Sequence, residues 1–377
     1  MNRLSYKTLT ETGFGGYLLR EAPEKVLQFG EGNFLRAFVD YFIDILNEKS
    51  GFNGKVCLVQ PIPGGDFIRE SINTQEGLYT LYLRGFENGG AVNRKRVISS
   101  VSRCINPYVD NAAFLDNAKN PDLRFIVSNT TEAGIAYDSS CKFDDAPANS
   151  FPAKMTRFLY ERFKIFGKEK GKGFIILSCE LIDNNGRELK SCVKLHATDW
   201  NLGEEFSRWI DEENIFCSTL VDRIVTGYPR DEANALNEEN GYEDNVIDTG
   251  ESFGFWVIEG PKSIADELGL AKADLPIIVV DDHTPYKQRK VRILNGAHTS
   301  FVLGAYLKGF NIVRDCMNDE GVRSFMEETI YAEIIPTLTL PEKELKDFAT
   351  SVTERFKNPF INHKLLDINL ILTRIAH

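Results

Sequence analysis

The order of elements near the start of the chain constrains the fold more than any other feature of the sequence. An apolar run at 26–29 is followed by the turn Gly30-Glu31-Gly32, and a second apolar run, KVCLVQPI, begins at Lys55. Between them a helix is predicted from about Asn33, because large apolar residues recur at every fourth position: Phe34, Phe38, Phe42 and Leu46. Strand, glycine turn, helix and strand in this order predict the opening of a doubly wound nucleotide-binding sheet.

The rest of the chain extends this pattern and then changes character. Further apolar runs at 123–128 and 173–179 predict strands, and the stretches GLYTLYLRGF and FGFWVIEG predict inserted or antiparallel strands. From about Lys287 the sequence predicts helices separated by short Gly, Pro and Asn punctuation. A chain of 377 residues also exceeds the usual size of a single core. We therefore predict an α/β protein, with a Rossmann-like doubly wound domain with extra strands at 1–280 and a mainly α-helical domain at 281–377.

Charge and cysteine usage narrow the class of protein. The net charge of -11 argues against nucleic acid as a partner, because that binding depends on clustered Lys and Arg. The sequence has no apolar start of the signal-peptide kind and no stretch of the ~18 to 20 apolar residues that cross a membrane, so we expect a cytoplasmic protein with no membrane partner. Seven scattered cysteines without a CxxC pair predict reduced thiols and no metal site.

The glycine turn is the first candidate for cofactor binding. Gly30 and Gly32 would let the backbone approach a pyrophosphate at the start of the helix, with Asn33 and Phe34 beside it. The match to the dinucleotide pattern is partial, because Leu35 stands where the third glycine is usual. The alternative is an ordinary turn without a ligand.

Two further groups of residues follow predicted strands. Asp66 is the nearest acidic residue after the second strand and is a candidate for the cofactor ribose, although a surface aspartate in a turn is an equal alternative. The lack of a basic cluster there favours NAD over NADP, a choice that Arg69 leaves open. Asn129, Thr130 and Glu132 follow the strand at 123–128, at the carboxyl end where open α/β sheets bind ligands.

Lys290, Asn295 and His298 form the candidate catalytic group. On an α-helix the three would fall within an arc of about 140°, with Asn295 and His298 one turn apart. A buried lysine can exchange a proton with a substrate oxygen, and an asparagine amide can stabilise alkoxide charge, so the set suits carbonyl reduction. The alternative is a surface lysine, a capping asparagine and a histidine whose hydrogen bonds are satisfied internally.

Asp222 and Arg223 lie together in the otherwise apolar stretch FCSTLVDRIVTG. A charged pair in such surroundings is commonly an internal salt bridge. The alternative is that Asp222 binds substrate hydroxyl groups.

Taken together, these segments resemble the mannitol dehydrogenase family of long-chain polyol dehydrogenases, over nearly the whole chain. The segments that carry the resemblance are QFGEGNFLRAFVD, FIVSNTTEAGI, KFDDAPA, CELIDNNG, FCSTLVDRIVTGYPRDE, IEGPKS, VDDHTPYKQRKVRILNGAHT and RFKNPFINHKLL. The resemblance implies that Lys290 is the general acid and base, that Asn295 polarises the carbonyl oxygen, that His298 orients the substrate and that Asp222 contacts it. It also implies a nicotinamide cofactor, no metal, and a site enclosed between the two domains.

The reaction implied by the resemblance is hydride transfer from NADH to the keto carbon of D-tagaturonate, giving D-altronate, in hexuronate catabolism. Fructuronate, or the keto sugar of a polyol 2-dehydrogenase, is the alternative substrate. Mannitol dehydrogenases proper have an asparagine where this chain has Leu181, and often an acidic residue where it has Lys287. A lysine there suits a substrate carboxylate, so Lys287 is a candidate substrate-binding residue, with a solvated lysine as the alternative.

The end of the chain also departs from the family, whose members continue into further helices. We therefore expect the helical domain to be incomplete at its C-terminus. This raises a hypothesis of a different class, a catalytically silent nucleotide-binding remnant that binds cofactor without turnover. The sequence does not predict an oligomeric state.

Overall fold

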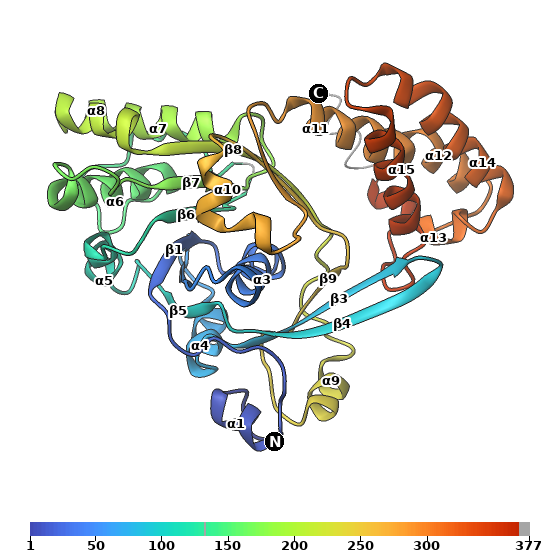
Figure 1. Cartoon of the computed structure of the whole chain (residues 1–377), viewed down its shortest axis with the longest axis horizontal. Coiled ribbons are helices and arrows are strands. Elements are labelled where there is room, and N and C mark those ends of the chain that lie inside the picture. Colours follow the sequence, from blue (N-terminus) through green and yellow to red (C-terminus); the bar gives the residue numbers. More distant parts are fainter. Residues whose placement is uncertain (132, 369–377) are drawn as a thin grey trace.

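A twisted eight-stranded sheet forms the centre of the protein in the computed structural model, which describes residues 1–131 and 133–368 (Figure 1). Six of its strands are parallel and stand in the order β5-β2-β1-β6-β7-β8. This is the doubly wound order 3-2-1-4-5-6 of dinucleotide-binding domains. The strands are β1 (Glu24–Phe29), β2 (Lys55–Val59), β5 (Val101–Ile105), β6 (Phe125–Ser128), β7 (Ile175–Ser178) and β8 (Ile215–Asp222).

Strands outside this parallel set extend the sheet and build a second one. β10 (Phe255–Glu259) joins β8 in antiparallel orientation, and β11 (Ile277–Val280) continues beside β10. A hairpin of β3 (Tyr79–Glu87) and β4 (Gly90–Ile98) forms a three-stranded sheet with β9 (Asp248–Glu251). The prediction of extra and antiparallel strands in this region is therefore confirmed.

Helices cover both faces of the main sheet, as the unbroken apolar character of its strands requires. Alternate strand residues face the two cores: Val26 lies in one and Leu27 in the other. One core receives α2 (Asn33–Leu35), α3 (Tyr41–Ser50) and α10 (Ser263–Leu268), and includes the predicted apolar stripe of the first helix. The other receives α5 (Asn111–Asp116), α6 (Phe151–Phe166), α7 (Asn185–Asp199) and α8 (Glu204–Glu213).

The chain after β11 is helical and has its own apolar core, built around Ile293, Phe301 and Met326. Its helices are α11 (Thr284–Arg289), α12 (Gly296–Leu307), α13 (Val313–Cys316), α14 (Glu320–Glu328) and α15 (Glu342–Phe356). The β3-β4 hairpin reaches across to this part (Figure 1), where Asn358 Nδ2 donates to Arg84 O at 3.1 Å. The prediction of a Rossmann-like fold followed by a helical region is thus confirmed.

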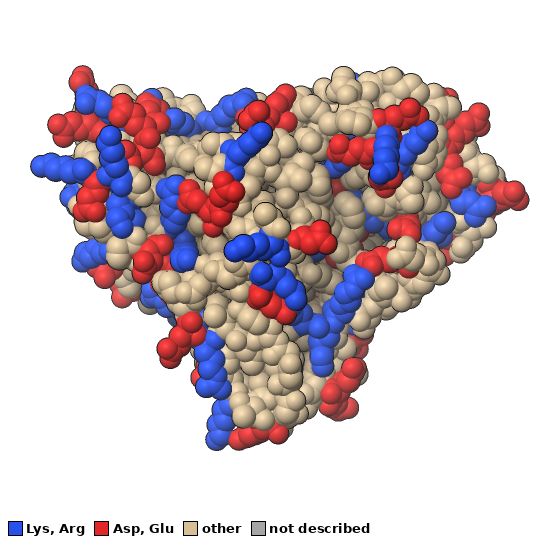
Figure 2. Space-filling view, viewed as in Figure 1, with Lys and Arg blue, Asp and Glu red and all other residues tan. Residues whose placement is uncertain are grey.

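Remaining helices lie at the edges: α1 (Tyr6–Glu11), α4 (Asp66–Thr74) and α9 (Ala233–Asn240). All seven cysteines are buried and unpaired, as expected of reduced thiols. Within residues 1–131 and 133–368, no helix has both the length and the apolar character that a bilayer crossing requires. Acidic and basic side chains are interspersed over the face shown in Figure 2.

Candidate active site

The carboxyl ends of the parallel strands meet at one edge of the sheet. Phe29 of β1 is level with Ser128 of β6, and Ser128 is level with Ser178 of β7. The connections from β1 and β6 leave in opposite directions, and such a switch point is where open α/β sheets bind their ligands. A cavity of about 440 Å³ lies here, with a lining that includes Phe34, Asn129, Thr131, Ala133 and Leu181.

The two glycines of the predicted cofactor turn have different structural roles. Gly30 has φ 130°, and a Cβ built on it would lie 3.0 Å from the Leu35 Cδ1 atom and 3.6 Å from Asn129 O. Gly32 has φ -68°, and no atom lies within 4 Å of the position that a Cβ would take there. Gly30 is therefore required by the local backbone, whereas Gly32 leaves open space at the start of the helix, where a phosphate would approach.

Leu35, which replaces the third glycine of the usual pattern, is buried beside Gly30. The helix then passes into a π-helical segment, Arg36–Asp40. The Arg36 guanidinium is buried there and donates to Glu31 O at 3.1 Å and to Asn33 Oδ1 at 2.6 Å. A buried arginine thus fixes both the glycine turn and the predicted cofactor residue Asn33, a contact that sequence reasoning did not foresee.

Asn129 and Thr130 are held by the end of the neighbouring strand. Asn129 Nδ2 donates to Cys179 O at 2.6 Å, and the Thr130 amide and hydroxyl both lie 3.1 Å from Glu180 Oε1. Burial raises the pKa of Glu180. Both predicted cofactor residues therefore lie at the switch point, while Glu132 is outside the described residues.

Asp66, the candidate for the ribose, begins α4 after a left-handed Gly65. Its Oδ1 atom accepts from Arg69 Nη2 at 3.2 Å and from Asn106 Nδ2 at 3.3 Å. Arg69 also lies 3.4 Å from Glu70 Oε1. Arg69, which left the choice between NAD and NADP open, thus contacts the carboxylates of both Asp66 and Glu70.

Lys290 lies against the carboxyl end of β8. Its Nζ atom donates to Val221 O at 2.8 Å and lies 3.7 Å from Asp222 Oδ1. Lys290 and Asn295 are the first and last residues of a helical segment that is a π-helix and not an α-helix. A π turn contains one residue more than an α turn, so residues five apart come onto one face. Lys290 and Asn295 are therefore closer in angle than the α-helical spacing predicted.

His298 lies one turn further on, where α12 meets α15. Its ring stacks on Phe356 at 4.4 Å between ring centres and meets His363 edge-on at 5.4 Å. Burial lowers the pKa of His298 to about 3, so the imidazole is neutral. Its Nε2 atom has no hydrogen-bond partner among the described residues, and a small cavity of about 20 Å³ adjoins it.

Asp222 and Arg223 do not form the internal salt bridge with each other that the sequence suggested. Arg223 donates instead to Ala37 O at 2.5 Å and to Phe253 O at 2.9 Å. Asp222 is 4% exposed, and its two oxygens accept from both terminal nitrogens of Arg355 at 3.0 and 3.2 Å. Asp222 is the last residue of β8 and Arg223 follows the strand, so the two side chains find different partners.

Lys287 forms an ion pair with Asp183, which lies in the segment between β7 and α7. Both side chains are partly exposed. Leu181, which stands where mannitol dehydrogenases have an asparagine, is 65% exposed in that segment. Lys287 therefore pairs with the segment that also contributes Leu181 to the lining of the cavity.

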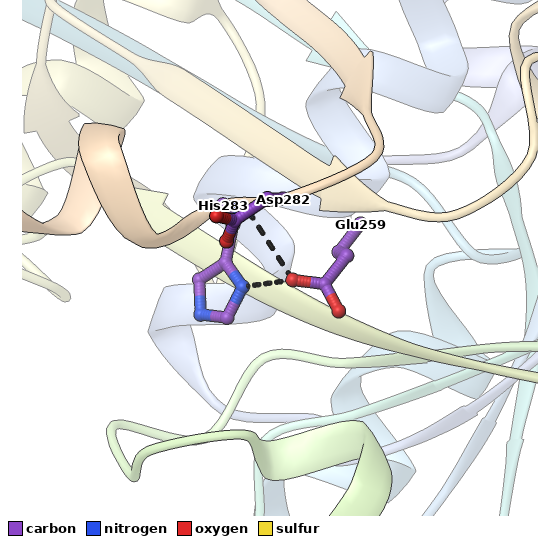
Figure 3. Close-up of side chains that lie close together, drawn as sticks. All are labelled: Glu259, Asp282 and His283. Carbon is purple, nitrogen blue, oxygen red and sulfur yellow. Dashed lines mark hydrogen bonds and ion pairs between the residues drawn. The ribbon is translucent and has the colours of Figure 1, made fainter.

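The start of α11, which leads into Lys290, is fixed by three side chains drawn in Figure 3. Glu259 Oε2, at the end of β10, lies 2.6 Å from His283 Nδ1 and accepts from the His283 amide at 3.2 Å. Asp282 Oδ1 accepts from the Thr284 amide at 2.8 Å. One potential ligand atom from each of the three residues lies within 4.8 Å of the other two. Because Arg187 pairs with the second Glu259 oxygen, we interpret them as an anchor for α11.

Comparison with known proteins identifies the family. The model of the mannitol dehydrogenase Rossmann domain matches residues 24–272, and that of the mannitol dehydrogenase C-terminal domain matches residues 282–372. An altronate oxidoreductase of Escherichia coli O7:K1 is 53% identical over 365 residues, which cover 97% of this chain and 74% of the relative.

Two solved structures share the fold. Mannitol 2-dehydrogenase of Pseudomonas fluorescens, in a ternary complex with NAD and D-mannitol, has a TM-score of 0.73 at 24% identity and covers 97% of this chain and 76% of its own. A D-sorbitol dehydrogenase in substrate-free form has a TM-score of 0.77 at 23% identity, covering 92% and 72%. The predicted fold and the predicted dehydrogenase class are therefore confirmed, and the chain belongs to the mannitol dehydrogenase family.

Proposed function

We propose that this chain is an NAD-dependent oxidoreductase that interconverts D-tagaturonate and D-altronate in the cytoplasm. The observation that carries the proposal is the position of Lys290, whose amine lies at the carboxyl end of β8 beside the buried Asp222. The name of the relative that is 53% identical, altronate oxidoreductase, supports the substrate. We assign nucleotide binding to residues 1–280 and substrate binding chiefly to 281–377.

The residues at the switch point fit a dinucleotide. Gly32 leaves open space at a helix start, and Asn129 borders the adjoining cavity. The negative charges of Asp66 and Glu70 beside Arg69 repel the second phosphate of NADP, which supports NAD. When bound, the nicotinamide supplies or accepts the hydride.

Side chains of the protein, and not the cofactor, transfer the proton. In reduction Lys290 gives a proton to the substrate oxygen, and in oxidation it removes one. The Asn295 amide donates to the same oxygen as negative charge develops on it. The neutral His298, with Nε2 unpartnered among the described residues, orients a substrate hydroxyl group.

Asp222 holds the site together electrostatically. Burial opposes its ionisation, but the charges of Arg355 and Lys290 keep its pKa below the ordinary value. Its oxygens are occupied by Arg355, so it contributes to substrate binding through the position of Lys290 and less through free acceptor sites.

The substrate carboxylate is assigned to Lys287. Its present partner Asp183 is 75% exposed, and exposed ion pairs contribute only about 0–1 kcal/mol, so a carboxylate of the substrate can replace it. Glu132 keeps its predicted role as a further substrate contact.

The test is NADH oxidation with D-tagaturonate, D-fructuronate and D-fructose offered in parallel. We expect turnover that prefers tagaturonate. Lys290→Met should lower kcat by at least about 100-fold with unchanged NADH affinity, because the amine acts on the substrate oxygen. Lys287→Met should instead raise KM for the uronates and leave that for fructose unchanged.

Each alternative function predicts a different result in this assay. A preference for fructuronate would reassign the substrate, and a preference for fructose would indicate a polyol 2-dehydrogenase. NADH binding without turnover of any of them would indicate the nucleotide-binding remnant.

A further inference from the structure

Arg355 connects the last long helix to the proposed catalytic lysine. It lies in α15 and is 9% exposed. Its guanidinium holds two carboxylates: Asp222 at the end of β8, through both terminal nitrogens, and Glu251 at the end of β9, through Nε at 2.9 Å and Nη2 at 2.7 Å. The ring of Phe253 lies 4.3 Å from its central carbon and closes one side.

Arg355 and Lys290 share a single carboxylate oxygen. Asp222 Oδ1 lies 3.0 Å from Arg355 Nη2 and 3.7 Å from Lys290 Nζ. The shorter, bidentate contact belongs to the arginine, because a planar fork matches a carboxylate better than an ammonium does. The lysine is left with the longer contact and with a hydrogen bond to Val221 O, which accepts from a charged or a neutral amine alike.

We propose that Arg355 is a positioning residue that occupies the Asp222 carboxylate and so prevents it from closing on Lys290 as a tight ion pair. Without Arg355, Asp222 would be a buried anion whose nearest cation is Lys290. The two would form a close pair, and the ammonium form would be stabilised at the expense of the neutral base.

The charged groups around Lys290 support this assignment. Asp222 is the carboxylate nearest to Lys290, and the cations that act on Asp222 are Arg355, Lys290 and Arg289. Glu251 lies on the other side of Arg355, and His298 and His363 adjoin the same arginine. The two histidines are neutral, since burial lowers the pKa of each. Arg289 pairs with Glu344 at 2.6 Å, so the cations within 4 Å of Asp222 among the described residues are Arg355 and, at the longer distance, Lys290.

The size of the effect follows from Coulomb's law. Two unit charges ~6 Å apart at an effective dielectric constant of ~20 move a titration midpoint by about two pH units, and water entering a variant site reduces this to about one. The sign is fixed, because removing a neighbouring cation stabilises the protonated amine. The midpoint of any process that needs neutral Lys290 should therefore move to higher pH.

The experiment measures the amine directly and does not depend on the proposed substrate. The full chain and its Arg355→Gln variant are labelled with trace acetic anhydride across a pH series, and acetylation of Lys290 is quantified by mass spectrometry. We expect the labelling midpoint in Arg355→Gln to lie about one to two pH units above that of the parent. Arg355→Lys, which keeps the charge but loses the bidentate contact, should give a midpoint between those of the parent and Arg355→Gln.

A second variant covers the case in which Arg355→Gln does not fold. The double variant Arg355→Gln/Glu251→Gln removes one charge of each sign, and its midpoint should also rise, since Arg355 is the group in contact with Asp222. An unchanged midpoint in whichever variant folds, as judged by its thermal unfolding, would overturn the proposal.

The inference rests on the proposed function only for its catalytic meaning. If tagaturonate is turned over, the alkaline limb of the pH-rate profile should move by the same amount in Arg355→Gln. If no substrate is turned over but the labelling midpoint still rises, the proposed function fails and the role of Arg355 stands.

Discussion

Gly30 and Gly32 are close in sequence, yet alanine should affect folding stability at the first position and cofactor binding at the second. Gly30 has φ 130°, a region that L residues other than glycine rarely adopt, and an alanine Cβ there would lie 3.0 Å from Leu35 Cδ1. Gly32 has an ordinary φ of -68° and open space around the added methyl group. Gly30→Ala should therefore destabilise the fold itself, and Gly32→Ala only the complex with a dinucleotide.

The magnitude follows from these two geometries. A residue held in a disfavoured backbone region costs about 1–3 kcal/mol, and displacement of Leu35 adds to this, so Gly30→Ala should lower the free energy of unfolding by about 2–4 kcal/mol. Gly32→Ala should change it by less than about 0.5 kcal/mol. Its methyl group would occupy the approach path of the pyrophosphate, and a displacement costing about 1.4–2.8 kcal/mol weakens binding about 10- to 100-fold.

Urea unfolding and titration of NADH by fluorescence measure the two quantities separately. Gly30→Ala should unfold at markedly lower urea concentration, while Gly32→Ala should unfold with the parent and bind NADH more weakly. The reasoning would be refuted if Gly32→Ala bound NADH with the parent's affinity, or if Gly30→Ala were as stable as the parent.

Three further substitutions test other parts of the structure. Burial raises the pKa of Asp40 to about 8, so between about pH 4 and pH 8 the folded state keeps a proton that the unfolded state has lost, and stability falls as pH rises through this range. Asp40→Asn should flatten this fall in the urea-derived free energy of unfolding, which is at most about 1.4 kcal/mol per pH unit. Glu259→Gln weakens the contacts that fix the start of α11 and should lower thermal stability by about 1–2 kcal/mol, together with kcat. Leu181→Asn adds an amide to an exposed position, so unfolding should be unchanged, while the ratio of kcat/KM for fructose to that for tagaturonate should rise.

Local sequence signals were sufficient to predict the sheet and the residues that lie at the carboxyl ends of its strands. Apolar runs bounded by glycine predict buried parallel strands, and the fourfold spacing of Phe34 to Leu46 predicts a helix that packs on them. The position of Asn129 after a strand placed it at the edge shared with Gly30, because the carboxyl ends of parallel strands lie together. These inferences depend on neighbours in sequence, and sequence contains that information directly.

The π-helical form of the segment at 290–295 could not be predicted from neighbouring residues in this way. Whether a helix forms i→i+4 or i→i+5 hydrogen bonds there depends on packing against β8 and α15, and no residue type in KVRILN specifies it. The α-helical spacing therefore placed Lys290 and Asn295 too far apart in angle, and their grouping with His298 in one catalytic site stays a prediction.

The partner of Asp222 shows a second limit, which has a functional consequence. The sequence offered Arg223 as its neighbour, but the carboxylate binds Arg355, 133 positions away, on a helix that packs from the other part of the chain. Buried charges must find opposite charges, so the ends of β8 and β9 and helix α15 require one another. Lys290 stands at this junction, beside the carboxylate that Arg355 occupies. The state of the proposed acid-base group should consequently depend on the docking of α15, a helix outside the nucleotide-binding sheet.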